Sequence, residues 1–207
     1  MAGHQDASPW VPPSRDLADL ETAAHECRGC ELWEPATQVV FSSGARSASV
    51  MLVGEQPGDQ EDRQGEPFIG PAGRVLDDAL SAAAIDRGAV YLTNAVKHFR
   101  FEQRGKRRIH QKPELRHVNA CHPWFDAELE AVQPRVVVAL GATAARAVFG
   151  RTMKIGESRG RLLDLTQERS AIITSHPSAV LRLRGRGGYD EAFGELVNDL
   201  RLAAPYA

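Results

Sequence analysis

Three cysteines and a histidine could form a metal site. Cys27 and Cys30 have two residues between them, a spacing in which both thiolates can bind one ion or cluster, and Cys121 lies far along the chain. Three thiolates leave one coordination position open, and His98 is the candidate because imidazole is the natural substitute for thiolate. The spacing favours a metal site over the alternative of a Cys27–Cys30 redox pair and a buried core thiol at Cys121.

Carboxylate and amide groups follow an apolar run. Residues 50–53 are Val-Met-Leu-Val, and Gly54, Glu55, Gln56 and Asp59 come directly after them. Glycine lets a ligand approach the backbone closely, Gln56 offers amide donors and an acceptor, and the two acids offer carboxylates. A tight turn with solvated acids remains the alternative.

Two further polar or aromatic groups lie at turns. Phe68 stands among the turn residues 66–73, where its ring could stack on a planar ligand or pack in the core. Asn94 ends the apolar run 90–93. Both positions could contribute to a ligand site.

A basic stretch stands out in a chain whose formal net charge is −2. Between residues 100 and 116, seven Lys or Arg side chains face only two Glu side chains, and Lys106, Arg107, Arg108 and His110 lie at its centre. Such a local field attracts phosphate. His110 could contact phosphate, act as a general base or act as a nucleophile. A solvated loop or a nuclear-import-like cluster remains the alternative.

The segment 175–182 combines a histidine with apolar and basic residues. His176 at a strand end could stabilise an oxyanion, and Val180 with Leu181 could wedge between stacked bases while Arg182 contacts phosphate. An ordinary strand-to-helix loop is the alternative.

The bulk composition is that of one globular domain, residues 1–207. The chain has 43% hydrophobic and 25% charged residues, and its length can bury a core without disulfides. Residues 1–14 contain three prolines and should form an irregular leader. We expect a cytoplasmic protein, because the sequence has no signal-like N-terminus and no apolar run long enough to span a membrane.

Strands and helices are expected to alternate. Strands are predicted at 49–53, 90–93, 136–140 and 171–174, and helices around 17–24 and at 72–84, 113–132, 144–149 and 189–203. Residues 39–49 should form a loop or short edge strand, and residues 100–112 an exposed loop. The pattern predicts a three-layer α/β/α sandwich with a mostly parallel central sheet, in which ligands bind beyond the carboxyl ends of the strands. The polar clusters at 54–59, 94–98 and 176–178 should therefore meet at one rim.

The order and spacing of these motifs closely resemble the uracil-DNA glycosylase superfamily. The motifs are Cys-x-x-Cys, Gly-Glu-Gln-Pro-Gly, Pro-Phe-Ile-Gly-Pro-Ala-Gly, Thr-Asn-Ala-Val-Lys, a distal Cys, and His-Pro-Ser followed by Leu-Arg, over about residues 27–182. The nearest branches are the iron–sulfur family-four enzymes. Gln56 in place of their alanine, His98 in place of their fourth cysteine, and the Lys-Arg-Arg-Ile-His loop resemble the UdgX subgroup, which becomes covalently joined to uracil-containing DNA.

The resemblance implies a reaction and a cofactor. It implies excision of uracil from DNA, preferably single-stranded, by a monomer that carries a [4Fe–4S] cluster on Cys27, Cys30, His98 and Cys121, with zinc as the alternative. His110 would capture the sugar C1′, oriented by Glu55, and His176 would stabilise the uracil anion. The remaining roles are uracil binding by Gly54, Gln56, Asp59, Phe68 and Asn94, and DNA contact by Lys106, Arg107, Arg108, Ser178 and Arg182.

Two other functions remain open from the sequence. A conventional glycosylase would release uracil, leave an abasic site and turn over many times. A non-catalytic nucleic-acid binding or redox-sensing module would bind DNA whether or not it contained uracil. The combination of Gln56, Phe68, Asn94 and His176 argues against the module, because phosphate binding needs none of them.

Overall fold

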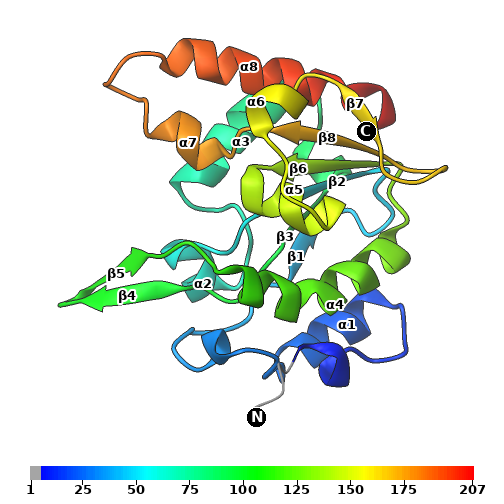
Figure 1. Ribbon diagram of the computed structural model, residues 1–207, viewed down its shortest axis with the longest axis vertical. Coiled ribbons are helices and arrows are strands. Elements are labelled where there is room, and N and C mark those ends of the chain that lie inside the picture. The colour runs from blue at the N-terminus through cyan, green and yellow to red at the C-terminus, as the bar shows by residue number, and fades with distance from the viewer. Residues whose placement is uncertain (1–5) are drawn as a thin grey trace.

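One mixed sheet organises the molecule. The computed structural model describes residues 6–207 and has a six-stranded sheet in the order β1-β3-β2-β6-β8-β7 (Figure 1). Its strands are β1 (Ser42–Gly44), β2 (Val50–Gly54), β3 (Tyr91–Asn94), β6 (Val136–Leu140), β7 (Leu162–Asp164) and β8 (Ser170–Thr174). The four central strands are parallel, and the short edge strands β1 and β7 are antiparallel to their neighbours. This confirms the predicted mostly parallel sheet and the short edge strand.

Helices cover both faces of the sheet. They are α1 (Leu17–Ala24), α2 (Asp59–Gln64), α3 (Pro71–Ala82), α4 (Leu115–Val132), α5 (Ala142–Phe149), α6 (Ile155–Ser158), α7 (Pro177–Leu181) and α8 (Tyr189–Arg201). One apolar layer contains residues of α1, α4 and α5, and the other contains residues of α3 and α8. Side chains of β2 alternate between the layers, with Met51 and Val53 in the first and Val50 and Leu52 in the second. Burial on both faces explains why the central strands are almost wholly apolar.

The basic stretch is not the loop that we expected. Phe101–Arg104 (β4) pairs with Arg107–His110 (β5) in an antiparallel hairpin, which projects from the body of the molecule (Figure 1). Gly105 begins the two-residue turn with a φ of +60°, a conformation that this kind of turn requires and glycine tolerates. The hairpin fixes the place of His110, the last residue of β5.

The expected irregular leader is partly ordered. Residues 1–5 lie outside the described part of the chain, but Ser8–Trp10 form a 3₁₀ turn (η1), and the Ala7 amide donates to the Ala120 carbonyl of α4 at 2.7 Å. A Cβ on Gly29 would lie 2.8 Å from the Ala7 backbone. The glycine between Cys27 and Cys30 therefore lets the leader pack against the cysteine turn.

Within residues 6–207, every helix is too short or too polar to cross a lipid bilayer.

Candidate active site

The carboxyl ends of the parallel strands surround one hollow, here called the rim pocket. β2 and β3 end side by side at the paired residues Gly54 and Asn94, and β8 ends two residues before His176. The pocket has a volume of about 810 Å³. Its lining includes most of the residues that the sequence singled out: Glu55, Gln56, Asp59, Phe68, Asn94, His110, His176, Ser178 and Arg182. The prediction that the polar clusters meet at one rim is confirmed.

Asn94 carries an unused acceptor. Its Oδ1 is the one buried side-chain oxygen or nitrogen in residues 6–207 that lacks a hydrogen-bond partner. Gly54 leaves space for it, because a Cβ there would lie 2.2 Å from this oxygen and 2.6 Å from Cζ of Phe68. An unpaired buried acceptor costs free energy, so its presence in a pocket indicates a ligand with a donor.

Phe68 is held in an unfavourable backbone conformation beside Asn94. Its φ is +57°, which is rare for a bulky residue, and a Cβ on Gly73 would lie 1.8 Å from its carbonyl oxygen. Glu61 of α2 stabilises the surrounding loops, because its carboxylate accepts from the Gly70 amide at 2.7 Å and from the Gly58 amide at 3.1 Å. The fold therefore fixes the aromatic ring in the pocket in advance of ligand binding.

His176 presents a neutral donor. Its Nδ1 accepts from the Ser178 amide at 3.1 Å and lies 2.9 Å from the Ser178 hydroxyl, so the ring proton must be on Nε2. Burial lowers the pKa of His176 to about 4, with further lowering from nearby His110 and Arg182. The imidazole is thus uncharged at neutral pH and can donate one hydrogen bond from Nε2.

Gln56 connects the rim to the ends of the hairpin. Its Nε2 lies 3.0 Å from Nε2 of His110, 3.0 Å from the Gln111 carbonyl and 3.2 Å from the Arg100 carbonyl, and its Oε1 accepts from the Arg100 amide at 3.1 Å. The amide group is therefore fully occupied within the protein. These contacts place Gln56 between the rim and the hairpin ends, and its expected contact with a base remains a prediction.

Glu55 also lies near the same imidazole nitrogen. Its Oε1 is 3.8 Å from Nε2 of His110, and its Oε2 accepts from the hydroxyl of Thr143 in the first turn of α5. Burial lowers the pKa of His110, Glu55 opposes this effect, and Arg182 adds to the lowering. His110 is therefore mostly neutral at pH 7, with an acidic side chain near enough to stabilise a positive ring.

The sequence that builds the rim pocket has known relatives. Residues 41–201 match the sequence pattern of the uracil-DNA glycosylase superfamily. The chain belongs to this superfamily. It is similar to the type-4 uracil-DNA glycosylase of Pyrobaculum aerophilum, with 35% identity over 82% of this chain and 88% of that protein. It is also similar to the type-4 enzymes of Thermotoga maritima, with 36% identity over 77% of this chain and 80% of that protein, and of Archaeoglobus fulgidus, with 31% identity over 87% and 91%.

Two of the polar residues expected to contact DNA or substrate are paired with each other in this superfamily member. Arg108 donates to Asp59 on one side and to the fully buried Asp62 at 2.6 Å on the other. Burial alone would raise the pKa of Asp59, but hydrogen bonds from Arg63 and Arg108 lower it. Arg108 and Asp59 thus attach the hairpin to α2, and the expected phosphate contact of Arg108 and base contact of Asp59 remain predictions.

Other cations remain available at the surface of the glycosylase domain. Lys106 and Arg107 lie at the exposed hairpin tip, and neither has an ion-pair partner in the described part of the chain. Lys112 and Arg182 line the rim pocket. These four residues offer positive charge without an internal ion pair, two at the hairpin tip and two at the pocket.

The three cysteines of the predicted metal site are near one another, and Cys121 belongs to α4. Cys27 and Cys121 are buried, and their Sγ atoms accept from Trp124 Nε1 and the Lys97 amide, each at 3.3 Å. Burial raises the pKa of Cys121 to about 12, and Cys30 and Cys27 are near enough to contribute. No three His, Cys, Asp or Glu side chains within residues 6–207 converge as they would around a single metal ion.

His98 is also buried in this region. Burial lowers its pKa to about 4, and nearby Arg28 and His25 act in the same direction. The ring is therefore neutral and has a lone pair for coordination.

Sequence reasoning missed Thr143 and Glu61 as members of the glycosylase site. Thr143 follows the end of β6, so the rule that ligands bind beyond strand ends could have identified it. Glu61 had no comparable signal, because its two amide partners become its neighbours only after the loops fold.

Proposed function

We propose that the protein excises uracil from DNA, and the unpaired Oδ1 of Asn94 in the rim pocket is the observation that carries the proposal. Uracil has an N–H donor at N3, whereas N3 of cytosine is an acceptor and would face Oδ1 with a lone pair. A site that must pair a buried polar group rejects the analogue that lacks the matching donor. The names of the type-4 relatives support the same activity.

The rest of the pocket fits an extruded base. Its volume of about 810 Å³ admits a nucleotide, and Phe68 provides a fixed aromatic face for stacking. As the bond between C1′ and N1 of uracil breaks, the electron pair stays on the base and is shared with O2. The Nε2–H of His176 is the neutral donor that can stabilise this charge.

The experiment measures free uracil from single-stranded oligonucleotides that contain one deoxyuridine or one deoxycytidine. We expect release from the first only, with loss of at least about a hundredfold in Asn94→Ala. Exposed Asn198 of α8 provides the matched Asn198→Ala control. Equal activity of Asn94→Ala and the control would contradict the proposal.

We also propose a preference for single-stranded DNA. The base must leave its stack to enter the pocket, and this costs least where no complementary strand holds it. Release from a single strand should be faster than release from the same strand in a duplex.

A second proposal concerns the sugar, for which His110 is the candidate acceptor group. Nε2 of His110 lies 3.0 Å from the amide nitrogen of Gln56, a group that cannot accept a hydrogen bond, so capture would use the neutral ring with its proton on Nδ1 and a lone pair on Nε2. That nitrogen would bond to C1′ as the base leaves with the former bonding pair. The ring becomes a cation, which Glu55 at 3.8 Å compensates, and uracil takes its proton from solvent.

The alternative acceptor is water, as in a turnover glycosylase. The two outcomes differ in a denaturing gel of protein mixed with uracil-containing oligonucleotide. We expect a band of protein joined to DNA in the wild type, and in His110→Ala free uracil without that band. A wild type that releases many uracils per molecule without the band would overturn the capture proposal and leave the excision proposal intact.

Finally, we propose that Cys27, Cys30, Cys121 and His98 hold a [4Fe–4S] cluster. The residue types fit this cofactor, because Cys27, Cys121 and His98 are buried, the imidazole is neutral, and two N–H groups already donate to the sulfur atoms. Ligands of such a cluster bind different iron atoms, so they need not converge on one point. The cluster would join the N-terminal segment to α4 and would not take part in the reaction.

A further inference from the structure

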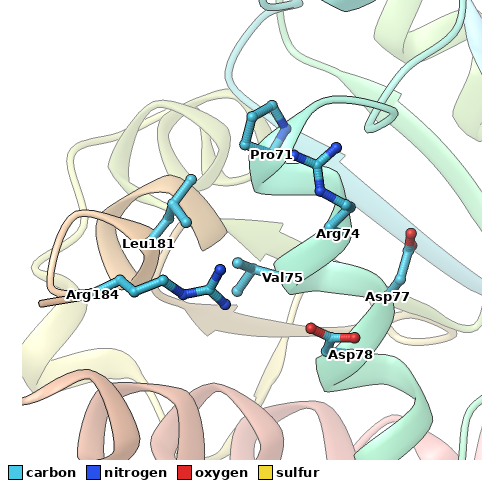
Figure 2. Close-up of a pocket in the computed structure, with 7 residues that line it drawn as sticks. All are labelled: Pro71, Arg74, Val75, Asp77, Asp78, Leu181 and Arg184. Carbon is cyan, nitrogen blue, oxygen red and sulfur yellow. The ribbon is translucent and has the colours of Figure 1, made fainter.

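A second, smaller hollow lies beside the rim pocket. It has a volume of about 270 Å³ and lies between α3 and α7, and we call it the α3–α7 groove (Figure 2). Pro71 and Leu181 line both hollows, so they form the ridge that separates them. Nothing in the proposed chemistry uses this groove.

Two arginines line the α3–α7 groove from opposite sides. Arg74 belongs to α3 and lies beside Pro71, and Arg184 extends from the segment after α7 toward α3 (Figure 2). Neither guanidinium forms a salt bridge within residues 6–207. Arg184 is oriented by Tyr189, whose hydroxyl accepts from it at 2.9 Å and whose ring centroid lies 4.9 Å from its Cζ.

The acidic groups of the groove do not cancel this charge. Asp77 is paired with Arg87, which leaves Asp78 as the carboxylate without an ion-pair partner in the described chain. Two guanidinium groups and one free carboxylate give a positive balance. Arginine forks match phosphate oxygens in geometry as well as charge.

We infer that the α3–α7 groove binds the phosphodiester next to the extruded uridine in the same DNA strand. The inference rests on the proposed function. A strand whose uridine occupies the rim pocket can leave over the Pro71–Leu181 ridge, and its next phosphate then lies between Arg74 and Arg184. Contacts of this kind hold the strand in register without reading its sequence.

The test measures binding of single strands that carry a deoxyuridine analogue whose glycosidic bond resists cleavage. One strand has several nucleotides on both sides of the analogue, and two others end at the analogue itself, so that one lacks its 5′ phosphodiester and the other lacks its 3′ phosphodiester. The variants are Arg74→Ala, Arg184→Ala and the double variant, and Arg46→Ala is the control. Arg46 precedes β2, at the opposite end of the sheet from the rim, and is exposed.

The long strand should bind the double variant about tenfold more weakly. The slope of the logarithm of the binding constant against the logarithm of the salt concentration should become shallower by about 0.7, because one phosphate contact is lost. Arg46→Ala should match the wild type. One of the two truncated strands should bind wild type and double variant equally, because it lacks the phosphate in question. Asp78→Asn should act in the opposite direction and strengthen binding of the long strand.

Three outcomes would overturn the inference. They are an unchanged affinity of the double variant for the long strand, an equal loss of affinity for all three strands, and weaker binding of the long strand by the Asp78→Asn variant. Failure of the proposed function has a different signature, because the wild type would then bind the long strand no better than a strand with cytidine in place of the analogue.

Discussion

The amide nitrogen of Gln56 lies 3.0 Å from Nε2 of His110, and the same side chain hydrogen-bonds both ends of the basic hairpin. One residue of the β2 loop therefore determines where the imidazole stands. Glu55, its neighbour in sequence, lies 3.8 Å from the same nitrogen. Orientation and charge compensation of His110 thus come from consecutive residues.

Replacement of Gln56 should reduce covalent capture of the sugar more than excision of uracil. In Gln56→Ala the hairpin ends lose their shared anchor, and the ratio of covalent product to released uracil should fall by about tenfold to a hundredfold. Quantified denaturing gels and uracil assays on the same samples measure this ratio. Exposed Gln103 of β4 gives the matched control Gln103→Ala, and an equal ratio in both variants would contradict the positioning role.

The pH dependence of covalent capture should follow the protonation of the His110 imidazole. Its pKa is lowered in the folded protein, so the ring is still mostly neutral at the ordinary histidine pKa of about 6.5. The single-turnover rate of capture should decline as pH falls, with a midpoint below about 6.5, because protonation removes the nucleophilic lone pair. A midpoint above about 6.5 would contradict this assignment.

Arg107 and Arg108 should behave differently although they are neighbours. Arg108→Ala leaves the buried Asp62 without its cation and should lower the free energy of unfolding by about 3 kcal/mol. Arg107→Ala, at the exposed hairpin tip, should change it by less than about 0.5 kcal/mol but weaken DNA binding. Urea unfolding and binding at low salt measure the two effects. Additional Asp62→Asn should recover part of the stability lost in Arg108→Ala, and no recovery would argue against the ion-pair explanation.

Loss of the proposed cluster should reduce stability more than chemistry. His98→Ala should contain less iron and acid-labile sulfide than the wild type and should unfold at a lower temperature. Uracil release by the fraction that remains folded should stay within a few-fold of the wild type, whereas His98→Cys should retain iron. His122 of α4 is partly exposed and provides the control His122→Ala. Equal iron content in His98→Ala and the control would remove His98 from the ligand set.

The sequence was sufficient to predict the sheet and the position of the rim pocket, because the carboxyl ends of parallel strands lie at the same edge of a sheet. Gly54, Asn94 and His176 could therefore be grouped from the order of apolar runs and the residues that follow them. The β4–β5 hairpin was not predicted, because its many charged residues leave no alternation of apolar and polar side chains. Only Phe101, Arg108 and Ile109 in the two strands are even partly buried.

The roles of polar side chains were harder to predict than their positions. Arg108 and Lys106 look equivalent in a basic run, yet only Arg108 meets Asp59 and Asp62 after folding. Gln56 has the chemistry to read a base, but backbone groups of the hairpin occupy its amide. Local sequence does not encode which distant partner a side chain will find.

A crystal structure with free uracil bound tests the central claim most directly, through the distance between uracil N3 and Oδ1 of Asn94. We predict a hydrogen bond of about 2.9 Å, with the base stacked on Phe68 and its O2 facing Nε2 of His176. Uracil bound outside the rim pocket, or inside it with Oδ1 still without a donor, would contradict the account.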